Sequence, residues 1–348
     1  MAERKVQKEF DKLLQDLKDK KFKYEPKETK SIDWASYDLA QLHEINEQLL
    51  LVRRLVDEAA ERLGTGKREN GVGKPPKSAA DKAKAILVQQ YFGVSNRLAA
   101  GLMILFDDKL GIEEEFTYKT IERAYGDSKV IQILELVFEL TNEPVADKET
   151  KFSIDGSGMP RSVKQNWAQD KDDDEKCAGY DKMVGMIGTT YKLYSAVSIT
   201  SNGNANESPF FVPLLERTAE LYETIELVCG DRAFPSKANC TAVENLGALP
   251  RIYPKKGAVL KQRGSHARKK MLLDFVEDLQ SWLRDYHNRS ISETGNTMWK
   301  GKFPKKLMKR LVRRRETEAF ARFCSHNILR LNYISWLFDI NVRWFKAA

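Results

Sequence analysis

Two aspartates follow apolar runs that have the character of strands. Asp155 comes after FSI and before Gly156, and Asp231 comes after IELVCG. We expect each aspartate to end its strand, where ligands and catalytic groups gather in an α/β sheet. A buried carboxylate costs stability without a partner, and hard carboxylate oxygens suit Mg²⁺ or Mn²⁺. The pair therefore predicts a divalent-cation site, although each aspartate alone could simply begin a turn or cap a helix.

A third acidic residue belongs to a short motif in the C-terminal part of the chain. Glu293 lies 62 residues after Asp231. Tyr286, Arg289, Glu293 and Lys300 are spaced Y-x2-R-x3-E-x6-K. This spacing resembles the Y-R-E-K signature of one large branch of the Asp-Asp-Glu (DDE) transposases of prokaryotic insertion sequences. The runs FSIDGSG and CGDRAFPS are similar to the two aspartate-bearing strands of that family, and YDKMVGMIGTTYKLYSAVS resembles the strands between them.

The resemblance covers about residues 150–335 and implies both a fold and an activity. The implied fold class is α/β, an RNase-H-like mixed sheet with flanking helices, preceded by an all-α N-terminal DNA-binding region. Asp155, Asp231 and Glu293 would hold two Mg²⁺ ions, for which Mn²⁺ could substitute. Two such cations about 3.5–4 Å apart can activate the attacking oxygen and stabilise the leaving oxygen of a phosphodiester. The implied reactions are cleavage at transposon ends and transfer of the 3′-hydroxyl into target DNA.

The same resemblance implies the partners. Tyr286, Arg289 and Lys300 would contact DNA phosphates near the cleaved end, since Arg can bind a phosphate through two parallel hydrogen bonds and Lys as a point charge. The partners would be double-stranded DNA, as terminal inverted repeats and as target, and a second copy of the chain in a homodimer on DNA. The implied location is the prokaryotic cytoplasm, at the nucleoid. Two alternatives stay open: a catalytically inactive DNA-binding relative, and an RNase-H-like nuclease without strand transfer.

Hydrophobic periodicity predicts the elements that must position these residues. Residues 1–63 have helical spacing, residues 64–77 form a linker rich in Gly and Pro, and residues 78–148 read as several short helices. From residue 149 to residue 340, strands are followed by alternating helices and strands, which predicts a mixed α/β sheet with helices packed on it. The resemblance implies that these residues are the catalytic domain. Within that domain we expect helices at Lys270–Asp285 and Glu316–Ile340.

The short helices of residues 78–148 are compatible with a helix-turn-helix module. Ser78, Ser95 and Thr117 are expected to cap them. In such a module the residues near a DNA groove would be Tyr118, Lys119, Thr120, Glu122 and Arg123. An ordinary helical bundle is the alternative.

Two stretches near Glu293 lead to further expectations. The segment KKLMKRLVRRR (residues 305–315) spaces its apolar residues as a helix does, which would leave a Lys and Arg face to follow a DNA backbone. Trp299, beside Lys300, could stack on a base, but we expect it in the core. The acidic run of residues 170–175 is expected to form a solvated loop.

The charge of the chain is unevenly distributed. The net charge is +8, but residues 251–348 hold 23 Lys and Arg against 8 Asp and Glu, and the rest of the chain holds 35 against 42. A basic C-terminal third predicts a polyanionic partner such as nucleic acid, unless it is only a solvated surface. The four Cys are too few for a disulfide scaffold and form no C-x2-C pair for zinc. No apolar run approaches the length of about 18 residues that a membrane span needs, so no membrane partner is expected.

Overall fold

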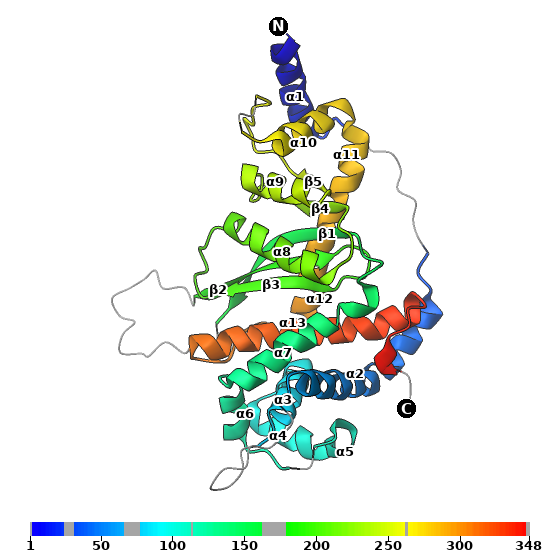
Figure 1. Cartoon of the computed structure of the whole chain (residues 1–348), viewed down its shortest axis with the longest axis vertical. Coiled ribbons are helices and arrows are strands. Elements are labelled where there is room, and N and C mark those ends of the chain that lie inside the picture. The colour runs from blue at the N-terminus through cyan, green and yellow to red at the C-terminus, as the bar shows by residue number, and fades with distance from the viewer. Residues whose placement is uncertain are drawn as a thin grey trace, which may run out of the picture.

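Five strands form a mixed sheet in the middle of the computed structural model (Figure 1). The strands are β1 (Lys151–Pro160), β2 (Tyr180–Gly188), β3 (Tyr194–Thr200), β4 (Leu227–Gly230) and β5 (Leu249–Ile252). Their order is β3-β2-β1-β4-β5; β2 is antiparallel to both β1 and β3, and β4 is parallel to both β1 and β5. This confirms the expected α/β class, an RNase-H-like mixed sheet.

The structure describes residues 2–23, 31–65, 77–112, 114–161, 179–261 and 264–345. Most of the predicted linker 64–77 and all of the acidic run 170–175 lie outside these residues.

Asp155 does not end its strand, contrary to the prediction. β1 continues to Pro160 because it stays paired with β2 along that length. Its parallel neighbour β4 stops earlier, and the last pair between the two strands is Ile154 with Gly230. Asp155 and Asp231 each follow one member of that pair. Asp231 therefore ends its strand as predicted, whereas Asp155 lies inside β1 at the point where β4 no longer pairs with it.

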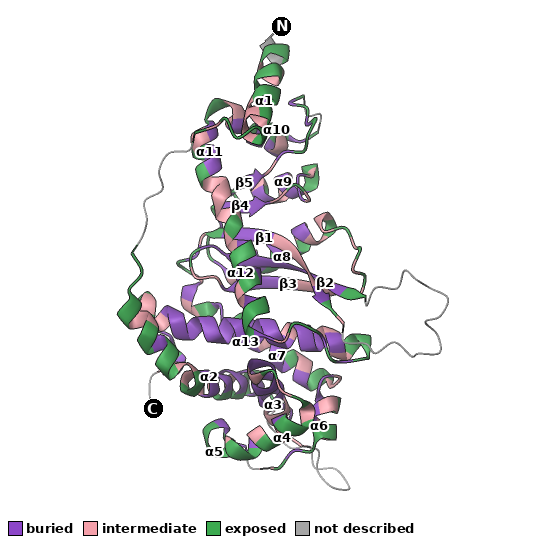
Figure 2. Cartoon of the chain, turned by 180° about the vertical axis from the view of Figure 1, so that it is seen from behind, coloured by how far each residue is buried: buried purple, intermediate pink, exposed green. Residues whose placement is uncertain are grey.

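Helices cover both faces of the sheet. α8 (Phe211–Leu221) packs on β2 and β3, and α12 (Ser290–Lys302) packs on β1 and β2 from the opposite side (Figures 1 and 2). The elements between them are α9 (Lys237–Asn245), α10 (His266–Glu277), α11 (Leu279–Tyr286) and the short 3₁₀ helix η3 (His287–Arg289). The single helix predicted at Lys270–Asp285 is thus two helices. The break occurs because Asp278 leaves the helical conformation and caps α11, its carboxylate accepting the Ser281 N–H at 3.0 Å.

Helices also precede the sheet, as predicted. They are α1 (Ala2–Lys18), α2 (Trp34–Arg62), α3 (Ala79–Phe92), α4 (Asn96–Leu105), α5 (Asp107–Leu110), α6 (Tyr118–Ala124) and α7 (Ser128–Leu140). The hydroxyls of Ser78, Ser95 and Thr117 accept the N–H three residues on and cap α3, α4 and α6, which confirms the three predicted caps. α1 lies at the other end of the molecule, where Phe10 meets Phe275 of α10 with ring centroids 5.4 Å apart (Figure 1).

α13 (Val312–Leu337) lies between the helices α2–α7 and the sheet. It packs on β3 and also on α2, α3 and α7, and most of its residues are buried (Figure 2). One hydrophobic cluster therefore continues from the helices through α13 into the sheet. Trp299 belongs to it: the residue is 3% exposed and stacks on Phe323 of α13 at 4.9 Å, which confirms its core position.

The basic segment before α13 is not the helix that its spacing predicts. α12 ends ahead of Pro304, and regular helix resumes only at Val312. Side chains of α13 hold the intervening backbone: the Glu318 carboxylate accepts the N–H groups of Met308 and Lys309, and Arg322 donates to the carbonyl of Pro304. These tertiary contacts decide the conformation here.

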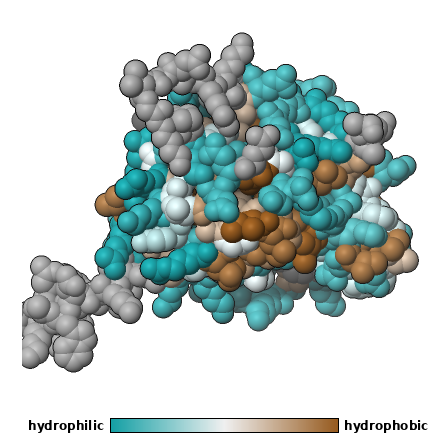
Figure 3. Space-filling view, turned by 90° about the horizontal axis from the view of Figure 1, so that it is seen from below, coloured by the Kyte–Doolittle hydropathy of each residue, from teal (hydrophilic) through white to brown (hydrophobic). Residues whose placement is uncertain are grey.

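No helix in the described ranges is long and apolar enough to cross a membrane. The end of the molecule opposite α1 nevertheless shows a gathering of apolar side chains on its surface (Figure 3). On α4, the exposed apolar residues are Leu98, Ile104 and Leu105.

Candidate active site

The sheet register makes Asp155 and Asp231 neighbours, because both follow the last parallel pair between β1 and β4. The pKa of Asp155 is raised to about 6, chiefly by burial and then by the negative charges of Asp231 and Glu207, while the Gly156 N–H and Arg289 act in the opposite direction. Negative charge thus accumulates in a partly buried place. Such an arrangement favours a bound cation.

The segment that carries the Y-R-E-K residues is anchored to the same two strands. Two residues before the first aspartate, the Ser153 hydroxyl donates to the carbonyl of Arg289 at 3.2 Å. Two residues before the second, the Cys229 thiol donates to the carbonyl of Asp285 at 3.4 Å. Residues two apart on a strand face the same side. The elements α11, η3 and α12 therefore lie over the sheet face to which both aspartates belong.

Tyr286 and Arg289 lie at this site. The Tyr286 ring stacks on Trp282 at 5.2 Å, and burial raises its pKa to about 12, so the hydroxyl is protonated near neutral pH. The guanidinium of Arg289 donates to Glu293 Oε1 at 2.6 Å. Burial lowers the pKa of Arg289, but Tyr286 and Glu293 outweigh this effect and the pKa is raised. Arg289 is therefore a permanent positive charge beside the carboxylates.

Glu293 and Lys300 lie on the exposed side of α12. The Glu293 side chain, in the first turn, is 55% exposed and is held by Arg289. Lys300 is exposed two turns further on. Among the residues that the structure describes, no three His, Cys, Asp or Glu side chains are close enough together to hold a metal ion. The structure thus brings Asp155 and Asp231 together, with Glu293 turned to Arg289 instead.

The two aspartates nevertheless fit a divalent metal ion. Their oxygens are of the hard type that Mg²⁺ prefers. Burial, and then the charges of Asp231 and Glu207, raise the pKa of Asp155, so a cation bound there would stabilise its ionised form. In this structure Glu293 Oε1 is paired with Arg289, so the side chain would have to turn toward the aspartates to add a third carboxylate.

Asn296 binds Asp155 directly and Tyr194 binds Asn296, and neither residue was predicted from the sequence. The Asn296 amide nitrogen donates to Asp155 Oδ2 at 3.0 Å, and the amide oxygen accepts from the Tyr194 hydroxyl at 2.9 Å. Asn296 follows Glu293 by three residues, so helical spacing could have placed both on one side of a helix. No such signal exists for Tyr194, which reaches Asn296 only through the packing of the sheet against α12.

Glu207 is a further acid that the sequence did not reveal at this site. It lies before α8, and its carboxylate packs so closely on Gly156 that a Cβ there would overlap with it. It also pairs with Lys182 at 3.1 Å. The glycine after Asp155 therefore makes room for this side chain within β1.

All five residues that the helix-turn-helix hypothesis placed near DNA belong to α6: Tyr118, Lys119, Thr120, Glu122 and Arg123. Tyr118, Lys119 and Arg123 are exposed. Glu122 pairs with Lys309 at 2.8 Å and with Arg314 at 3.0 Å, so the basic C-terminal segment neutralises its charge. A cavity of about 640 Å³ opens between α4, α6 and this segment.

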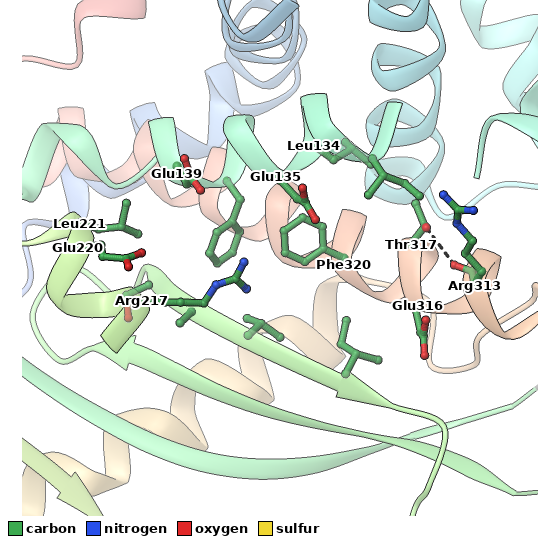
Figure 4. Close-up of a pocket in the computed structure, with 16 residues that line it drawn as sticks. Leu134, Glu135, Glu139, Arg217, Glu220, Leu221, Arg313, Glu316, Thr317 and Phe320 are labelled. Carbon is green, nitrogen blue, oxygen red and sulfur yellow. Dashed lines mark hydrogen bonds between the residues drawn. The ribbon is translucent and has the colours of Figure 1, made fainter. Parts of the chain in front are cut away.

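Another cavity, of about 420 Å³, lies on the other side of the sheet between α7, β3, α8 and α13 (Figure 4). Its charged residues are Glu135, Glu139, Glu220, Glu316, Arg217 and Arg313. None of the six predicted site residues lines it. Acids outnumber bases there, which disfavours DNA phosphates, so the aspartates beside α12 form the better candidate.

Comparisons with known proteins show which family the chain resembles. The family described as Transposase DDE domain matches residues 146–328. A probable transposase for insertion sequence element ISA1214, from Archaeoglobus fulgidus, is 26% identical over 293 residues, which are 83% of this chain and 86% of that protein. A solved structure, the Mos1 transposase paired-end complex with left transposon end, matches 68% of this chain and 84% of its own with 12% identity and a TM-score of 0.22. That structural likeness is too low to support a conclusion about this chain.

Proposed function

This chain belongs to the DDE transposase family, and from that premise we propose that Asp155, Asp231 and Glu293 bind the metal ions with which it cuts and joins DNA. The protein is a DNA transposase and its family depends on divalent metal. We assign the metal as two Mg²⁺ ions, for which Mn²⁺ can substitute. The observation that supports these residues is the register: both aspartates follow the last β1–β4 pair, with the Tyr286–Lys300 segment packed over them.

The proposal gives the carboxylates and the basic residues separate roles. Asp155 and Asp231 hold the cations from the strands, and Glu293 joins them when it leaves Arg289. When bound, the ions activate the attacking oxygen and stabilise the leaving oxygen of the phosphodiester. Arg289, freed from Glu293, can donate two parallel hydrogen bonds to a phosphate. Tyr286 and Lys300 contact phosphates near the cleaved end in the same proposal.

The wider proposal concerns the DNA and the assembly. Residues 78–148 read the terminal inverted repeats through α6, on which Lys119 and Arg123 are exposed, and residues 149–340 act as the catalytic domain. Cleavage exposes a 3′-hydroxyl, and the same carboxylates serve its transfer into target DNA because only the attacking oxygen changes. The enzyme works as a homodimer that holds two ends, at the nucleoid of a prokaryotic cell.

Cleavage of end-bearing DNA tests the proposal. The protein is incubated with Mg²⁺ and DNA carrying the ends of its element, and nicked and joined products are separated on a gel. We expect both products from wild type and a loss of at least about 100-fold in Asp231→Asn, because removing a metal-bound carboxylate removes transition-state stabilisation worth several kcal/mol.

Asp147→Asn is the matched control. Asp147 is an exposed acid just before β1 that pairs only with its neighbour Lys148 among the described residues, and we expect wild-type rates from this variant. Nicks without joined products would indicate a nuclease, and no nicks from wild type would indicate an inactive relative. Cutting by Asp231→Asn at the wild-type rate would refute the assigned residues.

A further inference from the structure

A chain of hydrogen bonds leads from β3 through α12 to Asp155. The Tyr194 hydroxyl donates to Asn296 Oδ1 at 2.9 Å, and Asn296 Nδ2 donates to Asp155 Oδ2 at 3.0 Å. Asn296 is 8% exposed and Tyr194 is 1% exposed. Buried polar groups of this kind are held in one geometry, because any alternative would leave a donor or acceptor without a partner.

The first member of the chain is rigidly placed. The N–H of Tyr194 donates to Asn327 Oδ1 at 2.9 Å, and its carbonyl accepts from Asn327 Nδ2 at 2.8 Å. Its ring meets Phe323 edge-on at 4.9 Å. Both partners belong to the buried helix α13. Burial also raises the pKa of Tyr194, so its hydroxyl keeps the proton that it donates.

The second member is oriented by the first. An asparagine amide has a donating and an accepting end, whereas an ionised carboxylate only accepts. Because Tyr194 donates to the oxygen of Asn296, the nitrogen must face Asp155. The close approach is possible because Gly295 has no side chain: a Cβ there would overlap with Ile187 and lie 3.3 Å from the Tyr194 hydroxyl oxygen.

We propose that Tyr194 and Asn296 form a positioning relay that fixes the Asp155 carboxylate for metal binding. The inference rests on the proposed function, since it takes Asp155 as a metal ligand. Neither residue touches the DNA or the reacting atoms in this assignment. The relay also ties α12, which carries Glu293, to the strand that carries Asp155.

Binding of Mn²⁺ to the metal-free full-length protein tests the relay, measured by isothermal titration calorimetry. Loss of a residue that orients a metal ligand commonly weakens metal binding by about 10–100-fold. We expect at least about tenfold weaker binding in Asn296→Ala and a smaller loss in Tyr194→Phe. Because Tyr194 acts through Asn296, the double variant should bind no more weakly than Asn296→Ala alone. The Mg²⁺ concentration for half-maximal nicking should rise by the same factor.

Tyr222→Phe is the matched control. Tyr222 is 4% exposed, and its hydroxyl donates to Asn142 Oδ1 at 2.6 Å, so the variant removes a buried Tyr–Asn bond. Asn142 donates to the backbone carbonyl of Tyr194 at 3.3 Å and not to the hydroxyl that binds Asn296. We expect it to bind Mn²⁺ as wild type does. An equal loss in Tyr222→Phe, or binding by Asn296→Ala within about twofold of wild type, would overturn the relay.

Asp155→Asn separates the two proposals. If it binds Mn²⁺ as well as wild type, the metal site itself is wrong. If it loses binding while Asn296→Ala keeps wild-type affinity, only the relay is wrong. Unfolding of each metal-free variant, followed by circular dichroism, shows that the comparison is made on folded protein.

Discussion

At the scale of single residues, the Asp155 carboxyl makes a testable contribution to stability. Its pKa is raised to about 6, mainly by burial, whereas an aspartate in an unfolded chain titrates near 3.9. Between about pH 4 and pH 6 the native state binds this proton more tightly than the unfolded state does. The free energy of unfolding of the metal-free protein should therefore fall as the pH rises through this window. The fall is at most about 3 kcal/mol and is reduced by solvent screening.

Urea unfolding of metal-free wild type and Asp155→Asn checks this prediction at about pH 4.5 and about pH 6.5. Asp155→Asn has no carboxyl group that titrates at this position, so its free energy of unfolding should fall less between the two pH values. The other titrating groups are the same in both proteins, so their contribution cancels in the comparison. Saturating Mn²⁺ at the higher pH should stabilise wild type and not the variant. The same change with pH in both proteins would contradict the assignment of the raised pKa.

At the scale of elements, the fit of α12 against the sheet depends on Gly295. Valine there would overlap with Ile187 and crowd Tyr194, and overpacking of this kind commonly costs about 1–3 kcal/mol. We expect Gly295→Val to lower the free energy of unfolding by that amount. DNA cleavage should also fall, because the displaced helix carries both Glu293 and Asn296. Chemical denaturation and the nicking assay measure the two effects.

Gly301→Val supplies the comparison for this prediction. Gly301 lies in the last turn of the same helix, and a Cβ there meets nothing within 4 Å. The intrinsic helix preference of the substitution is similar at both positions, so the difference between the variants isolates the packing. We expect a change within about 0.5 kcal/mol for Gly301→Val. Equal losses at both positions would show that α12 does not pack closely on β2.

Elements could be predicted from the sequence where local signals decide them. The strands follow from apolar runs, and the caps Ser78, Ser95 and Thr117 follow from side chains that bond to their own helix. Tertiary partners decide the rest. β1 is prolonged past Asp155 by its pairing with β2, and the segment after α12 is held out of a helix by Glu318.

In the candidate site, too, some residues can be predicted from a local signal and others depend on tertiary contacts. The motif spacing selects Tyr286, Arg289, Glu293 and Lys300 because they lie on one short segment of chain. That spacing does not show that Glu293 pairs with Arg289 in the absence of metal. It does not reveal Tyr194 either, because a residue of β3 reaches Asn296 only through sheet register and helix packing. Contacts between distant segments have no signature in one sequence.

At the scale of the whole molecule, α13 makes the helices and the sheet parts of one hydrophobic core. Phe323 is fully buried on α13, where it stacks on Trp299 of α12 and meets Tyr194 of β3. Truncation of a buried phenylalanine commonly costs about 3–5 kcal/mol. Because the core is shared, Phe323→Ala should lower the stability of α3 and of β2 by the same amount. Hydrogen exchange followed by mass spectrometry reads both segments in one experiment.

The control for Phe323→Ala is Phe338→Ala, beyond the end of α13. Phe338 is 41% exposed. Its truncation should therefore change the free energy of opening, as hydrogen exchange reports it, by less than about 1 kcal/mol in either segment. A loss confined to β2 in Phe323→Ala would mean that the first helices unfold on their own. An equal loss in both segments has a consequence for function. DNA held by α6 would then be fixed in orientation relative to Asp155 and Asp231, because no flexible joint in the core separates the two regions.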